Sequence, residues 1–364
     1  MSTRLSIVLP TYNERANIIP IAKELLPLSN IYDLEIIFVD DDSPDGTAAV
    51  VRQLAQTYPQ VRLICRVGRA GLSSAIKEGI LDAVGDLVVV MDCDGQHEPS
   101  TVIAALRNLQ ETGADLVIGS RFHSEAKILG LSSKRERNST LANAVARMSL
   151  PHYRELSDYM SGFFACRLQS VLPYVKQIDV GGFKFLYELL AISRGRLRVA
   201  EVPLQFQPRF SGESKLNIAI VWDLGISILH TLLLRSVPRR AISFALVGAT
   251  GIVTHLLVYA IAQYVFVLRF EVAQSLAVIC AASTNFLINN LLTFRFQQLH
   301  GWWLGLGLLR FLLVTSMGMV ANVGVSSALY NQTHQGTLIA LFAGIAVDFV
   351  WKYAASSKFV WHIP

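Results

Sequence analysis

The sequence predicts an α/β domain with a mostly parallel sheet, followed by a helical domain that crosses a membrane. Short apolar runs of strand length alternate with helical patterns through residues 1–120, which is typical of a doubly wound sheet. Of the 364 residues, 52% are hydrophobic and 16% are charged, and the charged residues become sparse after residue 240. We therefore expect a soluble domain at 1–215, an amphipathic helix and basic linker at 216–240, and a membrane domain at 241–364.

The first domain should contain five strands separated by helices. The expected strands are Leu5–Leu9, Leu34–Val39, Val61–Cys65, Leu87–Met91 and Leu116–Gly119. The expected helices are Asn17–Leu26, Thr47–Thr57, Ser73–Val84 and Ser100–Glu111. Apolar runs this continuous are typical of parallel strands that are covered on both faces.

Polar side chains follow four of these strands. They lie at 10–14, 40–45, 92–94 and 120–121, and the carboxyl ends of parallel strands form the edge where ligands of such sheets bind. Residues two apart in an extended chain point the same way, so Asp92 and Asp94 can both reach one hard cation. Cys93 should point to the opposite side and have a structural role. The pattern predicts a site for Mg²⁺ or Mn²⁺ and a nucleotide sugar.

Cysteine spacing and charge narrow the class of protein. The four cysteines show no C-x-x-C spacing, which favours free thiols in a reducing compartment. No signal-peptide pattern opens the chain, so we expect the first domain to be cytoplasmic. The net charge of +5 is modest, and the basic clusters lie near the membrane segments. Phosphates and lipid headgroups are therefore the expected partners, rather than nucleic acid.

Two amphipathic helices are expected, one late in the first domain and one in the segment that links it to the membrane domain. The helix at Asn138–Leu150 carries Leu141, Val145 and Met148 at helical spacing, which indicates that it lies on something apolar. The helix at Asn217–Leu234 has an apolar side with Trp222 and a polar side, and basic residues follow it. A membrane-surface helix and an ordinary core helix both fit this second pattern.

Four segments reach the roughly 20 apolar residues that a bilayer requires. They lie at about 241–267, 271–293, 304–329 and 337–357. Basic residues flank the ends that would face the first domain, so the positive-inside rule places that domain and the C-terminus in the cytoplasm. The expected protein is a multi-pass protein of the cell membrane.

A weak internal repeat runs through the membrane segments. Residues 243–253 are similar to residues 310–320, and the pair Asn285-Phe286 matches Asp348-Phe349. This predicts two helical hairpins repeated in the same orientation. Asp348 and Lys352 lie one helical turn apart, which indicates an ion pair that lowers the cost of burying both groups. A polar feature along a path for lipid headgroups is the alternative.

Eight motifs in the first 215 residues resemble the polyprenyl-phosphate glycosyltransferases, in particular the dolichyl-phosphate mannose synthases of glycosyltransferase family 2, which have the GT-A fold. The motifs are Thr-Tyr-Asn-Glu (11–14), Val-Asp-Asp-Asp-Ser-Pro-Asp (39–45), Gly-Leu-Ser-Ser-Ala (71–75), Met-Asp-Cys-Asp-Gly-Gln-His (91–97), Gly-Ser-Arg-Phe (119–122), Ser-Gly-Phe-Phe-Ala (161–165), Gly-Phe-Lys (182–184) and Gly-Glu-Ser-Lys (212–215). The C-terminal spans resemble the four-helix GtrA-type domain that is fused to some members.

The resemblance implies roles for individual residues. The nucleotide sugar would be bound by Pro10, Tyr12, Glu14, Val39, Asp41, Asp92, Cys93, Asp94, Gln96, Arg209 and Lys215. The metal would be bound by Asp92, Asp94 and Gln96, and the phosphate of the lipid acceptor by Ser120, Arg121 and Arg135. The expected catalytic set is Asp92, Asp94, Arg121, Arg135, Arg209 and Lys215. Ser211 stands where the family usually has a second arginine.

The implied reaction is metal-dependent transfer of a hexose to a polyprenyl or dolichyl phosphate with inversion of the anomeric carbon. The expected donor is GDP-mannose, with UDP-glucose as the alternative. A processive polysaccharide synthase is disfavoured because its Gln-x-x-Arg-Trp motif is missing from the sequence. A flippase or assembly module for lipid-linked sugars is the alternative from another class, and a catalytically silent binding module is the third. The oligomeric state stays open.

Overall fold

The computed structural model divides into an N-terminal unit, Met1–Thr231, and a C-terminal unit, Leu232–Pro364. It describes residues 3–68, 71–96, 99–128, 133–179, 184–206, 218–333 and 337–361. Within these ranges the side chains of 99, 127–128, 133–138, 206, 218–220, 296, 330–333, 337–338 and 340–341 are left out.

The N-terminal unit is built on seven strands in the order β3-β2-β1-β4-β7-β5-β8. They are β1 (Arg4–Thr11), β2 (Asp33–Asp40), β3 (Val61–Cys65), β4 (Leu87–Val90), β5 (Leu116–Ser120), β7 (Phe164–Arg167) and β8 (Val199–Pro203). All are parallel except β7, which pairs antiparallel with β4 and β5. A small second sheet pairs β6 (Lys127–Ile128) with β9 (Gln205–Phe206). The expected α/β fold with a mostly parallel sheet is confirmed.

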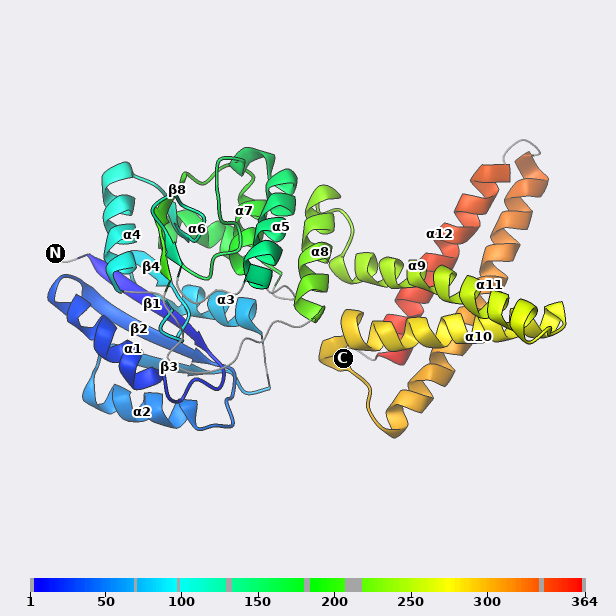
Figure 1. Cartoon of the computed structure of the whole chain (residues 1–364), viewed down its shortest axis with the longest axis horizontal. Coiled ribbons are helices and arrows are strands. Elements are labelled where there is room, and N and C mark those ends of the chain that lie inside the picture. The colour runs from blue at the N-terminus through cyan, green and yellow to red at the C-terminus, as the bar shows by residue number, and fades with distance from the viewer. Residues whose placement is uncertain are drawn as a thin grey trace. The chain divides into compact units, whose positions relative to one another are not determined.

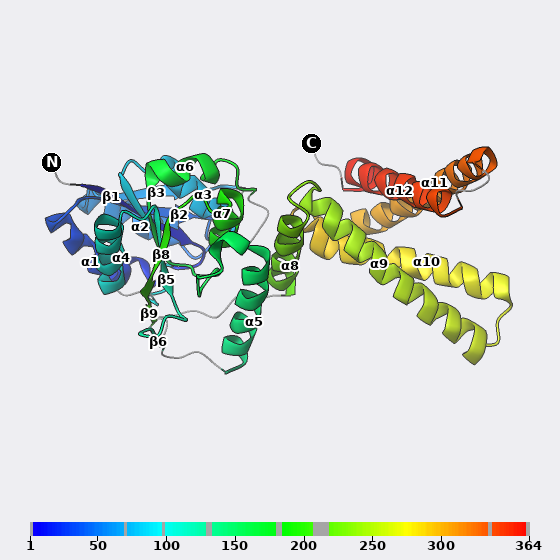
Figure 2. The ribbon, with the colours of Figure 1, turned by 90° about the horizontal axis from the view of Figure 1, so that it is seen from above.

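Helices cover both faces of the seven-stranded sheet (Figure 1, Figure 2). They are α1 (Ile18–Leu25), α2 (Thr47–Thr57), α3 (Leu72–Asp82), α4 (Pro99–Thr112), α6 (Leu168–Val175) and α7 (Phe185–Ser193). Val8 of β1 packs in one hydrophobic cluster with α3, α6 and α7, whereas Ile7 and Leu9 pack in the other with α1 and α4. This alternation explains why apolar residues occupy both faces of β1.

The five expected strands and four expected helices are all present, with boundaries that differ by at most a few residues. The strands β7 and β8 were not predicted. Each is short, at four and five residues, and β7 lies between β4 and β5 even though it follows both in the chain. Its position depends on contacts between distant residues, which local periodicity does not encode.

The two amphipathic helices keep part of their apolar surface exposed. Helix α5 (Ser133–Ser149) contains the predicted apolar stripe, but Leu141 is 66% and Met148 is 76% exposed. What covers this stripe is not part of the described chain's core, and its predicted contact with something apolar stays a prediction. In α8 (Ile218–Leu232) the apolar Val221 is 59% exposed, whereas the polar Ser227 is buried.

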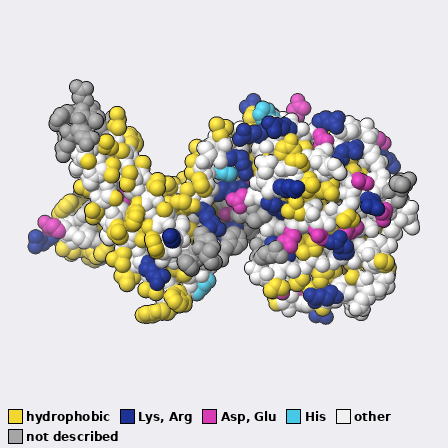
Figure 3. Space-filling model, turned by 180° about the vertical axis from the view of Figure 1, so that it is seen from behind, with side chains coloured by type: hydrophobic (Ala, Val, Ile, Leu, Met, Phe, Trp, Pro, Cys, Tyr) yellow, Lys and Arg dark blue, Asp and Glu magenta, His cyan; other side chains and the backbone are white. Residues whose placement is uncertain are grey.

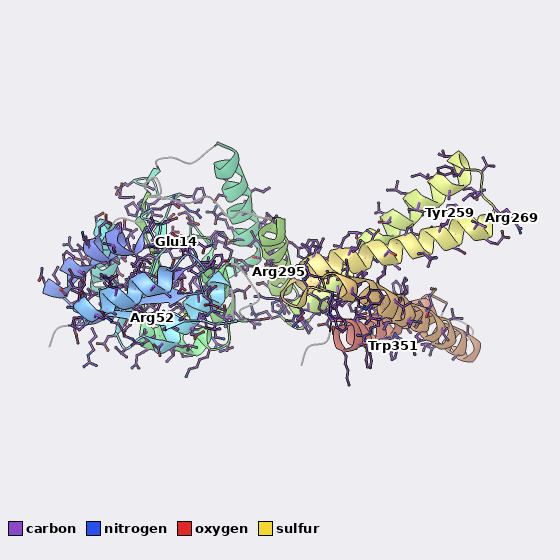
Figure 4. All side chains as sticks on the ribbon, turned by 90° about the horizontal axis from the view of Figure 1, so that it is seen from below. Glu14, Arg52, Tyr259, Arg269, Arg295 and Trp351 are labelled. Atoms are coloured by element: carbon purple, nitrogen blue, oxygen red, sulfur yellow. The ribbon has the colours of Figure 1, made fainter. Side chains whose placement is uncertain are left out.

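The C-terminal unit consists of two helical hairpins, α9 (Arg239–Ala260) with α10 (Phe270–Ile288), and α11 (Trp302–Thr333) with α12 (Thr337–Ala355) (Figure 1). Among the described residues, three helical stretches are long and apolar enough to cross a membrane: 239–265, 270–293 and 302–329. The fourth predicted span coincides with α12, which is not one of these three, so it stays a prediction. In Figure 4, Arg269 marks the connection between α9 and α10.

The structure confirms the internal repeat, because matched residues make matched contacts. A methyl group at Gly251 of α9 would collide with Asn285 of α10, and one at Gly318 of α11 would collide with Asp348 of α12. Aromatic contacts between the two hairpins match in the same way: Phe244 packs on Phe349, and Phe311 packs on Phe286. Lys352 donates to Asp348 at 2.7 Å, so the predicted ion pair is present.

Candidate active site

The order in which successive strands are added to the sheet reverses between the parallel strands β1 and β4. From β1 the chain proceeds through β2 to β3 on one side, and β4 lies on the other side. Ligands of open α/β sheets bind in the crevice at such a switch point, outside the carboxyl ends of the strands. The loops that follow β1 and β4 carry Tyr12, Glu14, Asp92 and Asp94, so the sheet order brings these predicted residues to one edge.

The two aspartates lie in a tight turn directly after β4. The backbone N–H of Gln96 donates to Oδ1 of Asp94 at 3.1 Å, and Asp94 is 6% exposed. Gly95 has a φ of +78°, a conformation that a side chain would strain. On a neighbouring segment of the same chain, a Cβ at Gly162 would lie 2.7 Å from Oδ2 of Asp92. The absence of a side chain at 162 thus makes room for the Asp92 carboxylate.

Cys93 points into the core, as predicted. Its side chain is 2% exposed and belongs to the same cluster as α1 and α4. Burial raises the pKa of the thiol well above its ordinary value, and the negative charges of Glu14, Asp94 and Asp92 raise it further. Three carboxylates therefore surround this short segment, and Cys93 stays a neutral thiol.

The donor set at this turn fits a hard divalent cation. Asp92, Asp94 and Gln96 offer carboxylate and amide oxygens, which Mg²⁺ and Mn²⁺ prefer. Within the described ranges, no group of three His, Cys, Asp or Glu side chains is arranged to hold a metal ion. A site with two carboxylates suits a cation that keeps water or substrate phosphates as its remaining ligands.

The loop after β1 is fixed by hydrogen bonds to the loop after β2. The N–H of Glu14 donates to Oγ1 of Thr47 at 3.0 Å, and the N–H of Arg15 donates to Asp45 at 3.1 Å. Burial raises the pKa of Asp45, but the hydrogen bonds from Thr47 and Arg15 outweigh it and hold that pKa below its usual value. The loop leaves Tyr12 46% exposed, and its predicted contact with the nucleotide sugar stays a prediction.

Pro10 and Val39 face each other across β1 and β2, in the register of the parallel pair. Val39 is fully buried. Both residues therefore sit at the predicted edge, and their predicted contact with a nucleotide stays a prediction.

Asp41 has a partner that sequence reasoning missed. Arg66, which is 2% exposed, forms ion pairs with Asp41 and with Glu78. The N–H of Gly71 also donates to Asp41 at 2.7 Å. Burial raises the pKa of Asp41, against the opposing effects of the Gly71 hydrogen bond and Arg66. Asp41 thereby ties the Gly-Leu-Ser-Ser-Ala loop to the end of β2.

Arg121 forms a two-point ion pair with Asp158. Its Nε donates to Oδ2 at 2.7 Å and its Nη2 donates to Oδ1 at 2.9 Å. Asp158 is fully buried, and burial alone would raise its pKa, but the Arg121 guanidinium holds it below the ordinary value. The turn before Asp158 is fixed by Glu201 of β8, which accepts from the N–H of Ser157 at 2.9 Å. Neither Asp158 nor Glu201 was predicted, because both lie outside any local motif.

Ser120, the last residue of β5, is also fully buried. The hydroxyl groups of Ser120 and Ser157 form a hydrogen bond with each other. The Ser120 hydroxyl also accepts a hydrogen bond from the N–H of Phe122 at 3.1 Å. Its hydrogen bonds therefore shape the turn that carries Arg121. A direct contact with the acceptor phosphate stays a prediction.

Lys184 lies at the start of α7, within electrostatic reach of Arg121, Asp158 and Asp92. Burial lowers the pKa of its ammonium group, and the positive charge of Arg121 lowers it further. The sequence carried it in the motif Gly-Phe-Lys, without an assigned role.

Three predicted phosphate ligands cannot be placed. Arg209 and Lys215 lie outside the described residues, and of Arg135 only the backbone, in α5, is described. Their predicted roles remain expectations from the sequence.

Two family models match this chain, one in its N-terminal part and one in its C-terminal part. The profile of Glycosyl transferase family 2 matches residues 6–171, and that of the GtrA/DPMS transmembrane domain matches residues 243–361. A dolichol-phosphate mannosyltransferase of Pyrococcus furiosus is 34% identical over 98% of this chain and 99% of its own. Another, of Saccharomyces cerevisiae, is 35% identical over 61% of this chain and 84% of its own.

One solved structure with a similar fold is that of glucosyl-3-phosphoglycerate synthase from Mycobacterium tuberculosis in complex with Mn²⁺, uridine-diphosphate and glucosyl-3-phosphoglycerate. It superposes with a TM-score of 0.49 at 22% identity, over 65% of this chain and 81% of that chain.

Proposed function

Because this chain belongs to the dolichol-phosphate mannosyltransferases, glycosyltransferases of family 2 with a GtrA/DPMS transmembrane domain, we propose that it transfers mannose from GDP-mannose to a dolichyl or polyprenyl phosphate. The product is a lipid-phosphate sugar with a β linkage.

The observation that carries the proposal is the position of Asp92 and Asp94. They follow β4 at the switch point of the sheet, beside β1, whose following loop carries Tyr12 and Glu14. A nucleotide bound there has its diphosphate beside the two carboxylates. A divalent cation would be held by Asp92, Asp94 and Gln96, and when bound it neutralises charge on the donor diphosphate.

The chemistry requires little from a general base. An oxygen of the acceptor phosphate forms a bond to the anomeric carbon of the sugar, and the bond from that carbon to the diphosphate breaks, with its electron pair leaving on the diphosphate. The acceptor phosphate is anionic near neutral pH, so no proton must be removed from it. The role of Arg121 is to orient this phosphate, because guanidinium groups match phosphate geometry. A single displacement from an α-linked donor inverts the carbon.

The membrane supplies the acceptor. Exposed apolar side chains on α5 and α8, such as Met148 and Val221, provide surfaces that suit contact with a bilayer. The basic residues next to the predicted spans favour a cytoplasmic site for the N-terminal unit and the C-terminus.

A transfer assay with the purified full chain in detergent tests the proposal. We expect Mn²⁺, labelled GDP-mannose and dolichyl phosphate to yield a chloroform-soluble labelled lipid, and nuclear magnetic resonance of that lipid to show a β linkage. UDP-glucose in a parallel reaction tests the alternative donor. A faster reaction with UDP-glucose would overturn the assignment of mannose, and the absence of product with either donor would overturn the transfer itself.

A further inference from the structure

Lys184 is anchored beside the proposed reaction centre by the residue that follows it. The ring of Phe185 stacks on Phe164 of β7 with centroids 5.9 Å apart. Phe164 pairs with Val90, the last residue of β4, and Gly162, two residues before Phe164, packs against Asp92. The backbone of Lys184 is therefore tied to the same strand ends that carry the two aspartates.

The ammonium group of Lys184 has no hydrogen bond or ion pair within the described part of the chain, although it is partly buried. Arg121, Asp158 and Asp92 are the charged groups that act on it. A partly buried cation without a direct partner is costly. An anion that binds at this site would remove that cost.

The charge of the neighbouring cation, Arg121, is already neutralised by Asp158. Arg121 spends Nε and one donor of Nη2 on Asp158, so the pair of residues carries no net charge. A phosphate monoester carries a charge of about −1.5 to −2 near neutral pH. A second cation is needed beside Arg121 to balance it, and Lys184 is the nearby described side chain that has no counter-charge in direct contact.

We infer that Lys184 is a further substrate-binding residue, whose ammonium group donates to the phosphate of the lipid acceptor. This inference rests on the proposed function, because it places the acceptor phosphate between Arg121 and Lys184. The donor diphosphate is the other source of a phosphate at this site, and the two sources are separated by the test below.

Binding and turnover of the full-length enzyme in detergent provide the test. The probe is a short-chain polyprenyl monophosphate, titrated by calorimetry into enzyme saturated with GDP and Mn²⁺, with the polyprenol that lacks the phosphate as its control. The variants are Lys184→Met and Lys184→Arg, and the matched control is Lys23→Met, which removes an exposed lysine of α1.

We expect Lys184→Met to weaken binding of the monophosphate by about tenfold to a hundredfold, the usual effect of losing a hydrogen bond between charged groups. The KM for the acceptor should rise by a similar factor, with the affinity for GDP and the KM for GDP-mannose unchanged. Lys184→Arg should restore part of the affinity, and Lys23→Met should match the wild type.

Unchanged binding of the monophosphate in Lys184→Met would overturn the inference. A loss of GDP affinity in place of acceptor affinity would overturn it too, by assigning Lys184 to the donor. Because the titration requires no turnover, it gives its answer even if the wild type fails the transfer assay, so failure of this inference is distinguishable from failure of the proposed function.

Discussion

Asp158 and Arg121 illustrate how single residues prepare this site. The carboxylate is fully buried and holds two nitrogens of one guanidinium, at 2.7 and 2.9 Å. Fixing the guanidinium in advance reduces the entropy that a bound phosphate must otherwise overcome. Asp158 is thus a positioning residue, which acts on the substrate through Arg121.

We predict that Asp158→Asn lowers the free energy of unfolding of the N-terminal unit by about 3–5 kcal/mol, because it leaves the guanidinium without its buried counter-charge. A urea titration of the full chain in detergent, followed by fluorescence, measures this loss. The control is Asp33→Asn, which breaks the exposed pair of Asp33 with Arg4 and should cost less than about 1 kcal/mol. Equal losses in the two variants would contradict the prediction.

The same pair predicts a pH dependence. The folded-state pKa of Asp158 lies below its ordinary value of 3.8, so its stabilising effect is fully present above that value and is lost as the pH falls through the folded pKa. The difference in unfolding free energy between wild type and Asp158→Asn should be constant from neutral pH down toward 3.8 and shrink below it. A difference that disappears near neutral pH would contradict the assignment.

Motifs predicted the position of Asp92 and Asp94, because an apolar run that ends in acidic residues is a local signal. Arg66, Asp158 and Lys184 were missed in their present roles. Arg121 and Asp158 are 37 residues apart, and their contact requires β7 to insert beside β5. No spacing rule connects them, so only the folded chain shows the pair.

At the scale of elements, the first five strands were predictable because each contains a short, mostly apolar run between helical patterns. The C-terminal hairpins were predictable for a related reason, since lipid-exposed and core-facing positions are both apolar. Among the described residues, the apolar character continues over the surface of the C-terminal unit, whereas the N-terminal unit carries most of the charged side chains (Figure 3). The apolar stripe of α5 is exposed within the described chain, and an apolar pattern alone does not reveal what covers it.

The matched helix contacts make a prediction for the C-terminal unit. Gly318→Val should destabilise the hairpin of α11 and α12, because even its Cβ would collide with Asp348 and press on Lys352. Overpacking of this kind typically costs about 1–3 kcal/mol. Gly251→Val should behave alike, because Gly251 holds the same place against Asn285.

Gly324→Val is the matched control, since nothing lies within 4 Å of a Cβ at that position of α11. Thermal unfolding of the full chain in detergent should show lower midpoints for the Gly318 and Gly251 variants than for the control. The same midpoint in all three variants would count against the repeat of helix contacts.

At the scale of the whole molecule, the chain combines two physical environments. A sheet whose switch point collects carboxylates suits a polar, charged donor, and long apolar helices suit the lipid that carries the acceptor. The sequence showed this division through composition alone, because charge and hydropathy change together near residue 240. The identity of the sugar nucleotide leaves no comparable signal in the sequence, because recognition of the base depends on loop contacts rather than on composition.

The most direct test of the account is the rate of sugar transfer by the double variant Asp92→Asn/Asp94→Asn in the presence of Mn²⁺, GDP-mannose and dolichyl phosphate. Asp33→Asn is the matched control, because Asp33 is an exposed aspartate at the start of β2, away from the carboxyl ends of the strands. Loss of both carboxylates should reduce the rate by at least about a hundredfold, the usual effect of removing charge stabilisation at a reaction centre, and the control should transfer sugar near the wild-type rate. A double variant that transfers mannose as fast as the control would contradict the placement of the reaction at the end of β4.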